Sequence, residues 1–305
     1  MTRFEIVMTD FVSPKDLANA IGASESSLKR WVDGGLLGVH RTAGGHRRIP
    51  VTEAVHFIRT RKLKVVRPDL LGLSPALELD AEMSADQEHG DRLLSHLTEG
   101  KLVQARGLIT TLFLQGTPIA QIADGPILHA LEEIGKMWRH DREGILIEHR
   151  ALEACISAVN VLLPLLAPNI SEKPMCAIGS SLPNDPYILP NILVTAVLTE
   201  CGFNPTNLGA NLPISLLCSE ARRLRPSLVW VSASVVDDSK SSSSELDELA
   251  REVLAWNGTL AIGGREAHRL QLSDSDAISL CSNMEEMAAL AQRIQAATAA
   301  ESSAS

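Results

Sequence analysis

A short basic segment near the N-terminus carries the residues whose chemistry is plainest. Four cationic or ionisable side chains surround the diglycine Gly44-Gly45. They are Arg41, His46, Arg47 and Arg48. A diglycine between two short extended runs is typical of a hairpin tip, and guanidinium groups bind phosphate oxygens well. The segment therefore predicts a hairpin that contacts a polyanion.

The residues before and after this hairpin predict three helices that would position it. Ser13-Pro14 is an N-cap followed by a proline at the first helical position, and Ser24 can cap a second helix after a break at Gly22. Gly34-Gly35 ends the second helix, and a third is expected over residues 52–64. Two helices joined by a tight turn form a helix-turn-helix, whose second helix can enter the major groove of DNA.

The second helix divides into two sides. Leu28, Trp31 and Val32 recur at helical spacing and are expected in the core, Trp31 included. Lys29 and Arg30 would then face outward. This helix can therefore pack on one side and contact a ligand with the other.

The order of these features resembles the DNA-binding domain of MerR-type transcription regulators. The matching residues are Trp31-Val32-Asp33-Gly34-Gly35-Leu36-Leu37 and Arg41-Thr42-Ala43-Gly44-Gly45-His46-Arg47-Arg48-Ile49. The resemblance covers residues 1–70 and implies a winged helix-turn-helix head that binds double-stranded operator DNA. It implies that the second helix offers Ser26, Ser27, Lys29 and Arg30 to DNA, and the wing Arg41, His46, Arg47 and Arg48.

The charge is distributed unevenly along the chain. Residues 1–68 hold 12 Lys or Arg and 6 Asp or Glu, a net charge of +6, whereas the remainder holds 16 and 31, a net charge of −15. A basic head on an acidic body directs the head toward a polyanion and the body elsewhere.

Two compositional features bear on the compartment. The five cysteines are widely spaced and form no CxxC pair, which favours ordinary buried thiols over a metal site or disulfides. No continuous apolar run reaches the roughly 18 to 20 residues of a membrane helix, and the N-terminus has acids where a signal peptide is apolar. We therefore expect a cytoplasmic protein that does not contact a membrane.

The middle of the chain predicts a linker and a helical bundle. Residues 71–90 contain Pro75, small residues and an acidic cluster without sustained periodicity, and are expected to be a linker. Residues 91–170 predict four amphipathic helices with short breaks, which favours an antiparallel bundle. The sequence has no heptad pattern for the long dimerising coiled coil of many MerR regulators.

One spacing in this region stands out. Trp138, nine further residues and Glu148-His149 lie where the third helix is expected to give way to the fourth. The spacing resembles the helical cap of cobalamin-binding MerR regulators, the light-responsive carotenogenesis repressors. That resemblance implies that Trp138, Glu148 and His149 lie over a bound flat ligand. The alternative is a bundle end plugged by a core tryptophan, with Glu148-His149 at a helix start and His149 hydrogen-bonded rather than ligating a metal.

From residue 173 to residue 300, strands alternate with helices, which predicts a doubly wound, Rossmann-like parallel sheet. Strands are expected over 175–182, 227–234, 259–262 and 277–281, and helices over 188–201, 244–254 and 284–297. Ligands of such sheets bind at the carboxyl ends of the strands. The segment 183–190, Ser232 and Gly263-Gly264 fall at those ends.

A bundle followed by this sheet resembles the cobalamin-binding module, whose signature is D-x-H-x-x-G, then S-x-L, then G-G. The matching positions are Asp185, Ser232, Gly263 and Gly264, and the departures are Tyr187, Pro190 and Ser234. Tyr187 stands where a histidine ligates cobalt from below, and a neutral phenol is a poor substitute for imidazole. Pro190 stands where a glycine lets the backbone approach the corrin tail, and proline adds a ring there. We therefore expect no cofactor; if one is bound, it is a tetrapyrrole or a cobalamin without a histidine from this position.

These patterns favour a multidomain α and α/β protein that regulates transcription by sequence-specific DNA binding, without a catalytic site or resident metal. A homo-oligomer is expected because operators usually present paired half-sites. The degenerate cobalamin-binding-like module would serve assembly, contact with a protein partner, or binding of a non-cobalamin ligand. The alternative is a tetrapyrrole- or cobalamin-dependent light-sensing repressor. A cobalamin enzyme is disfavoured because these regions leave no substrate domain.

Overall fold

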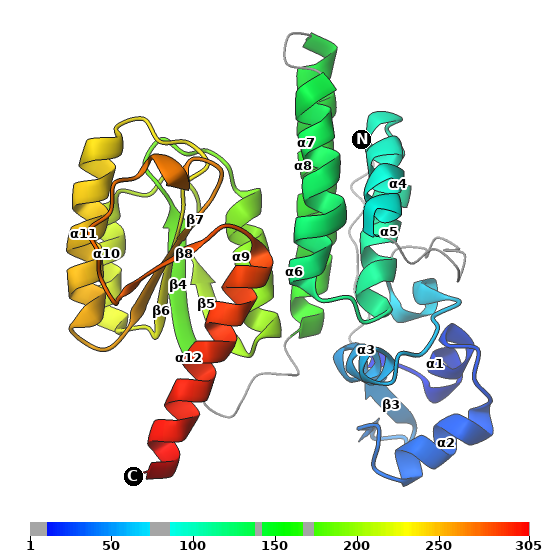
Figure 1. The fold of residues 1–305 in the computed structure, drawn as a ribbon. Coiled ribbons are helices and arrows are strands. Elements are labelled where there is room, and N and C mark those ends of the chain that lie inside the picture. Colours follow the sequence, from blue (N-terminus) through cyan, green and yellow to red (C-terminus); the bar gives the residue numbers. More distant parts are fainter. Residues whose placement is uncertain (1–10, 74–85, 138–141, 167–173, 305) are drawn as a thin grey trace. The chain divides into compact units, whose positions relative to one another are not determined.

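The chain divides into two compact units (Figure 1). The computed structural model describes residues 11–73, 86–137, 142–166 and 174–304. The first unit comprises Met1–Pro118 and Gly125–Pro168, and the second Ile119–Asp124 and Asn169–Ser305. A short segment from the middle of the chain therefore belongs to the unit that holds the parallel sheet.

The first unit begins with two short helices, α1 (Pro14–Ala20) and α2 (Glu25–Asp33). The Ser13 hydroxyl accepts a hydrogen bond from the Asp16 main-chain N–H at 3.1 Å, and the Ser24 hydroxyl accepts one from Ser27 N–H at 3.1 Å. Both predicted N-caps are therefore confirmed. After Gly34, Gly35 has a φ of 70°, a conformation that glycine adopts without strain, and the helix ends there as predicted.

Three short antiparallel strands follow the order β1-β3-β2. They are β1 (Phe11–Val12), β2 (His40–Arg41) and β3 (Arg47–Pro50). The pairing places Arg41 opposite Arg47 across the hairpin, and Gly45 at its tip has a φ of 79°. The predicted hairpin is confirmed.

Helix α3 (Val51–Thr60) joins this hairpin to the helices of the same unit. It ends four residues before the predicted limit of 64. The guanidinium carbon of Arg59 lies 3.8 Å from the centroid of the Phe113 ring, and its Nη2 donates to the Thr117 carbonyl oxygen at 3.3 Å. A cation over an aromatic face is attracted to it, so this contact fixes the end of α3 on the adjoining helix.

Four longer helices follow among the described residues of the first unit. They are α4 (Asp86–Thr98), α5 (Leu102–Leu114), α7 (Leu128–Met137) and α8 (Arg142–Leu166). Helix α5 packs on α4 and α8, and α7 also packs on both α4 and α8. Two predicted boundaries are wrong. Residues 86–90 of the expected linker are helical, since α4 begins at Asp86, and residues 74–85 lie outside the described residues.

The second wrong boundary is the start of α8. This helix begins at Arg142 rather than at Glu148, because Ile145, Leu146 and Ile147 continue the helical run. Glu148 and His149 therefore lie in the second turn and not at the helix start.

Among the described residues, the stretch Gly144–Leu166 is long and apolar enough to cross a membrane by length and composition. Of its most apolar part, 44% is buried inside the protein. Core helices of folded proteins pass the same test of length and composition.

The second unit contains five parallel strands in the order β5-β4-β6-β7-β8. They are β4 (Met175–Ser181), β5 (Phe203–Asn207), β6 (Leu228–Ser232), β7 (Thr259–Gly263) and β8 (Ile278–Cys281). The strand order reverses between β5 and β6, on the two sides of β4, which creates a topological switch point at the carboxyl ends. The predicted Rossmann-like parallel sheet is confirmed.

Helices cover both faces of this sheet (Figure 1). They are α9 (Leu189–Glu200), α10 (Ile214–Leu224), α11 (Ser239–Leu254) and α12 (Met284–Ala304). Helices α10 and α11 bury one face of the sheet. On the other side α9 packs on α12, and both pack on the short helix α6 (Ile119–Ile122), which leads into a π-helical turn (Ala123–Ile127).

Candidate functional sites

The first candidate site is the outer side of α2. Ser26, Lys29 and Arg30 are exposed and Ser27 is half-buried, whereas Leu28 is buried at 1% exposure. The Ser24 hydroxyl lies 2.9 Å from the hydroxyls of both Ser26 and Ser27. Helix α2 therefore presents its first turn as a set of small hydroxyl groups, followed by two cations.

The hairpin presents a second set of cations. Arg41, His46 and Arg48 are exposed, whereas Arg47 is half-buried and forms an ion pair with Asp33, with Nη2 and Oδ1 3.0 Å apart. Asp33 is the last residue of α2, so this pair joins the hairpin to that helix. Arg47 thus positions the hairpin as well as adding charge to it.

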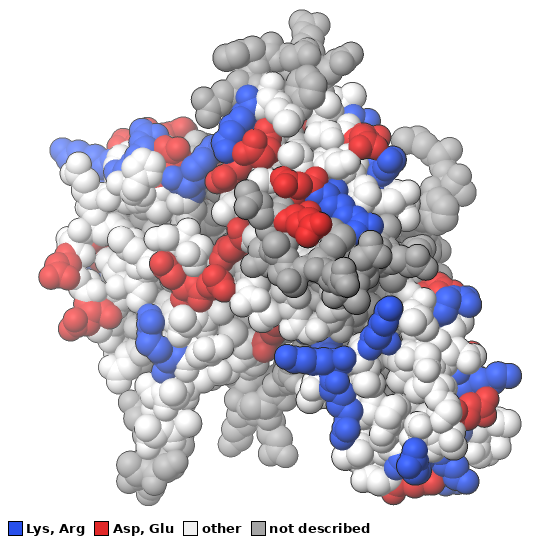
Figure 2. All heavy atoms as spheres, turned by 45° about the vertical axis from the view of Figure 1, so that its right-hand side comes forward, with Lys and Arg blue, Asp and Glu red and all other residues white. Residues whose placement is uncertain are grey.

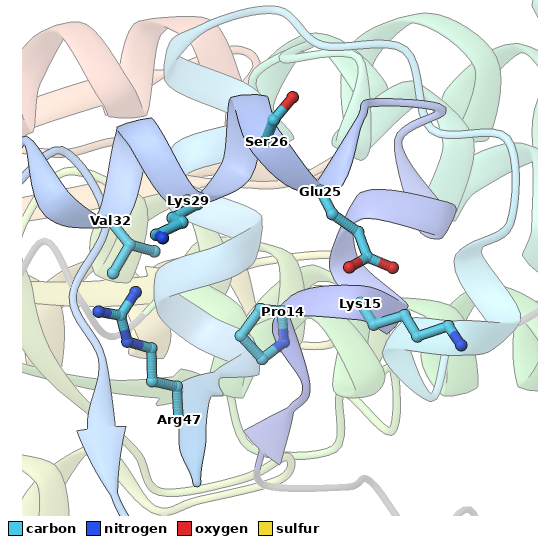
Figure 3. A pocket seen from close by; sticks show the side chains of 7 residues that line it. All are labelled: Pro14, Lys15, Glu25, Ser26, Lys29, Val32 and Arg47. Carbon is cyan, nitrogen blue, oxygen red and sulfur yellow. The ribbon is translucent and has the colours of Figure 1, made fainter.

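A hollow of about 310 Å³ lies between α1, α2 and β3 (Figure 3). Its lining consists of Pro14, Lys15, Glu25, Ser26, Lys29, Val32 and Arg47. In Figure 3, Lys29 and Arg47 lie toward one side of the hollow, with Lys15 and Glu25 toward the other. The lining holds three cations and one carboxylate, and Arg47 is also paired with Asp33. One net positive charge remains, which favours an anion. Figure 2 shows further Lys and Arg side chains spread over this part of the first unit.

The second candidate site is the carboxyl edge of the sheet. Asp185 follows β4 and is fully buried. Its Oδ2 accepts hydrogen bonds from the main-chain N–H groups of Ser234, at 2.6 Å, and Val235, at 3.3 Å. Its Oδ1 accepts one from Tyr187 N–H at 3.0 Å. The carboxylate is therefore satisfied by the chain itself and ties the loop after β4 to the loop after β6.

The glycine pair at this edge, Gly263-Gly264, is explained by the packing of the protein backbone. A Cβ at Gly263 would lie 2.6 Å from the Cys281 carbonyl oxygen. A Cβ at Gly264, whose φ is 111°, would lie 2.7 Å from the backbone of Ala233. Both distances are too short for a side chain. The two glycines are thus required by the close approach of neighbouring backbone segments.

Tyr187 and Ser232 complete this edge. The Tyr187 ring is half-buried, with the Arg265 guanidinium carbon 5.9 Å from its centroid. Ser232 ends β6 at 5% exposure, and within the described part of the chain its hydroxyl has no hydrogen-bond partner. The structure therefore brings Asp185, Tyr187, Ser232 and the glycine pair to the carboxyl ends of β4, β6 and β7, as predicted from sequence.

The placement of the predicted cap residues over a ligand stays a prediction. Trp138 lies outside the described residues. Glu148 is half-buried and His149 is exposed, both on α8 of the first unit. Among the residues that the structure describes, no group of three or more His, Cys, Asp or Glu side chains could hold a metal ion.

The thiols are poor nucleophiles. Cys155, Cys218 and Cys281 are buried, Cys176 and Cys201 are half-buried, and all five are free. Burial raises the pKa of Cys155 to about 12 and that of Cys201 to about 11. The thiolate is the reactive form, so these groups suit packing better than covalent chemistry.

A histidine-ligated cobalamin does not fit the residues of the sheet edge. Position 187 carries a phenol, and its main-chain N–H is already bound by Asp185. Pro190 places a ring in the first turn of α9. Sequence reasoning missed two polar residues of this region, Asn191 and Arg265. Asn191 is a lone amide in an apolar helix, and Arg265 directly follows the diglycine. Both positions could have indicated a polar residue at this edge of the sheet.

Comparison with known proteins supports the fold of this part. No family model matches the chain, and no curated protein sequence does so. A monomethylamine corrinoid protein from Methanosarcina barkeri matches with a TM-score of 0.54 and 21% identity, over 69% of this chain and 100% of that chain. The matched 69% of the chain therefore has a cobalamin-binding-like fold.

Two other solved structures match with lower TM-scores. A novel cobalamin-binding protein from Desulfitobacterium hafniense DCB-2 has a TM-score of 0.34 and 18% identity, over 67% of this chain and 97% of that chain. A methanol:cobalamin methyltransferase complex from Methanosarcina barkeri has a TM-score of 0.32 and 14% identity, over 78% and 88%. At these identities the likeness concerns the fold alone.

Proposed function

We propose that this protein is a DNA-binding transcription regulator, with a winged helix-turn-helix head of the MerR type at residues 1–70. The observation that carries the proposal is the joint between α2 and the hairpin. The Arg47–Asp33 ion pair at 3.0 Å holds together two elements whose remaining cations point outward. Within the described residues, Lys29, Arg41 and Arg48 make no ion pair or side-chain hydrogen bond, so they are available to DNA.

The two elements suit different parts of a duplex. Helix α2 would enter the major groove, where Lys or Arg side chains recognise guanine and serine hydroxyls bind any base edge or phosphate. Its candidates are Ser26, Ser27, Lys29 and Arg30. The hairpin would lie along the backbone, where Arg41, His46 and Arg48 would contact phosphates.

The hollow beside α2 supports the same orientation. Lys29 and Arg47 lie on one side of it, and Lys15 lies on the other (Figure 3). A backbone phosphate at the rim of the major groove would meet Lys29 and Arg47 there. Glu25 on the opposite side would disfavour an anion there, which would fix the phosphate nearer to Lys29 and Arg47.

The remaining chain would act without enzymatic chemistry. The cobalamin-binding-like module would serve assembly of a homo-oligomer on paired half-sites, or contact with a protein partner. Two features of the module support this role. Asp185 is hydrogen-bonded within the protein, and the diglycine Gly263-Gly264 allows neighbouring backbone segments to approach closely.

Selection of bound sequences from a random duplex library tests the proposal. The full-length protein is expected to enrich one sequence with two half-sites. The double variant Arg41→Ala/Arg48→Ala should lose binding to that duplex. The matched control, Arg222→Ala/Arg223→Ala, removes the same charge from α10 and should retain binding. If no sequence is enriched, or both variants bind equally, the head is not a DNA-binding domain.

A second candidate function is light sensing through a tetrapyrrole or a cobalamin held without a histidine. The buried, unpartnered Ser232 hydroxyl favours it, because a polar ligand atom would satisfy this group. The test is an absorption spectrum in the dark, after mixing with adenosylcobalamin, hydroxocobalamin, haem or biliverdin and desalting. A retained chromophore supports this candidate, and a colourless protein that still binds DNA excludes it for these ligands.

A further inference from the structure

One large side chain inside the second unit is unexplained by the sequence signatures. Trp230 lies in β6, two residues before Ser232, and is 1% exposed. Alternate residues of a strand point to the same face of a sheet. Trp230 and Ser232 therefore face the same side, and the contact of Trp230 with Asn191 shows that this is the side covered by α9.

The indole is held by a polar chain that crosses three elements. Its Nε1–H donates to Asn191 Oδ1 at 3.0 Å, and Asn191 is itself 1% exposed. Asn191 Nδ2 in turn donates to the Gly209 carbonyl oxygen at 3.2 Å. A buried polar group is stable when it has a partner. This chain therefore links β6 to α9 and to the loop after β5, with the indole between them.

The neighbouring strand is shaped to the ring. Gly179 of β4 pairs directly with Trp230 in the parallel register. A Cβ at Gly179 would lie 2.1 Å from Trp230 Cδ2, well inside the van der Waals limit. The ring thus lies across β4 in the space that any larger residue at position 179 would occupy.

The Trp230 ring lies close to residues at the positions of the cobalamin-binding signature. Asn191, which holds the indole, is the neighbour of Pro190, where the resemblance implies a glycine that admits the corrin tail. Ser232, the matching serine, follows Trp230 by two residues on the same face. We infer that the Trp230 indole occupies, within this chain, the space where a module of this fold would take up a planar ligand group. The module accordingly packs around the Trp230 side chain in place of a ligand.

This inference deepens the proposed function, because it explains how a cobalamin-binding-like module can serve as a ligand-independent platform. It predicts that the interior is complete without a cofactor.

Replacement of the ring by a free aromatic base tests the inference. Trp230→Ala in the full-length protein should unfold at a lower temperature, and added indole or benzimidazole should raise its midpoint by mass action. Neither base should raise the midpoint of the wild type, and hydroxocobalamin should wash off it during desalting. The matched control is Trp256→Ala. This variant loses an equal ring from a half-exposed site, where Nε1 donates to the Pro226 carbonyl oxygen at 3.0 Å. Its midpoint should not respond to either base.

Rescue that is absent from Trp230→Ala, or equal in both variants, would overturn the inference, as would hydroxocobalamin retained by the wild type. A measurement on the wild type covers the case in which Trp230→Ala does not fold. The Trp230 indole N–H should exchange slowly with deuterium and keep its chemical shift in excess hydroxocobalamin. Fast exchange or a shifted resonance would also overturn it. Neither readout involves DNA, so failure here leaves the proposed head function standing.

Discussion

The Asp185 carboxylate lies 2.6 Å from the main-chain nitrogen of Ser234, 49 residues further along the chain. The same carboxylate also accepts from Val235 and Tyr187 N–H groups, and it is fully buried. A residue that matches a ligand signature thus works here as an internal support for two loops. Its contribution is to the stability of the sheet edge.

Asp185→Ala should therefore destabilise the protein strongly. The substitution leaves buried N–H groups without acceptors, which costs about 3 kcal/mol of unfolding free energy. Asp185→Asn keeps one acceptor and should lose about half as much. Urea unfolding measures both. A fully stable Asp185→Ala would contradict the support role.

The two arginines of β3 should differ in their effects on DNA binding. Arg48→Ala removes an exposed cation and should lower the slope of log affinity against log salt by about 0.9. Arg47→Ala should lower it similarly, and should also weaken binding further by freeing the hairpin from Asp33. Fluorescence anisotropy at several salt concentrations measures both. Asp33→Ala, which breaks the same ion pair without removing a cation, should reproduce the second effect alone.

His96 on α4 should make the protein sensitive to mild acid. Burial lowers the pKa of this imidazole, and the nearby charges of Arg92 and Lys101 lower it further. Both of its ring nitrogens are buried without a hydrogen-bond partner among the described residues. In the unfolded chain the pKa of His96 is about 6.5, so the unfolded chain takes up a proton at higher pH than the folded one. Stability should fall as the pH drops below about 6.5.

His96→Gln should flatten this pH dependence between pH 7 and pH 5, as measured by thermal unfolding. His56→Gln, which replaces an exposed histidine on α3, is the control and should keep the wild-type profile. Equal profiles for the two variants would show that His96 is not the sensitive group.

Asp124 should anchor the C-terminal helix. Its Oδ1 accepts from Met284 N–H at 2.9 Å and its Oδ2 from Glu285 N–H at 2.8 Å, at the start of α12. Loss of such a cap costs about 1 to 2 kcal/mol. Asp124→Ala should lose this much in urea unfolding and increase hydrogen exchange in α12. Unchanged exchange there would exclude the anchor.

Local signals in the sequence predicted the elements that depend on local chemistry. Ser13-Pro14, Ser24 and Gly44-Gly45 each specify a cap or a turn within a few residues, and each is found as predicted. Strand β5 was missed, because Phe-Asn-Pro-Thr-Asn is polar and contains a proline, as suits an edge strand. Helix α10 was missed as well.

The candidate site was predictable only in part. The signature positions at the strand ends were visible, since parallel strands place their carboxyl ends at one edge. Their partners were not. Trp230 and Asn191 are 39 residues apart, and nothing local to either one specifies the contact. The start of α8 also differs from the prediction, since the helix begins at Arg142 and not at Glu148.

The segment Ile119–Asp124 has a consequence for how such a protein could be recombined. It belongs to the sheet unit, where Ile119 N–H donates to Glu200 Oε2 at 2.8 Å and Asp124 caps α12. A genetic exchange that joins two relatives at residue 168 would give the sheet a foreign version of this segment. An exchange at residue 118 would keep this segment with its native partners but would separate α5 from α8, which pack on each other in the first unit. No single crossover from residue 118 to residue 168 therefore keeps both units whole, because the chain enters the sheet unit once, returns to the first unit, and only then forms the sheet.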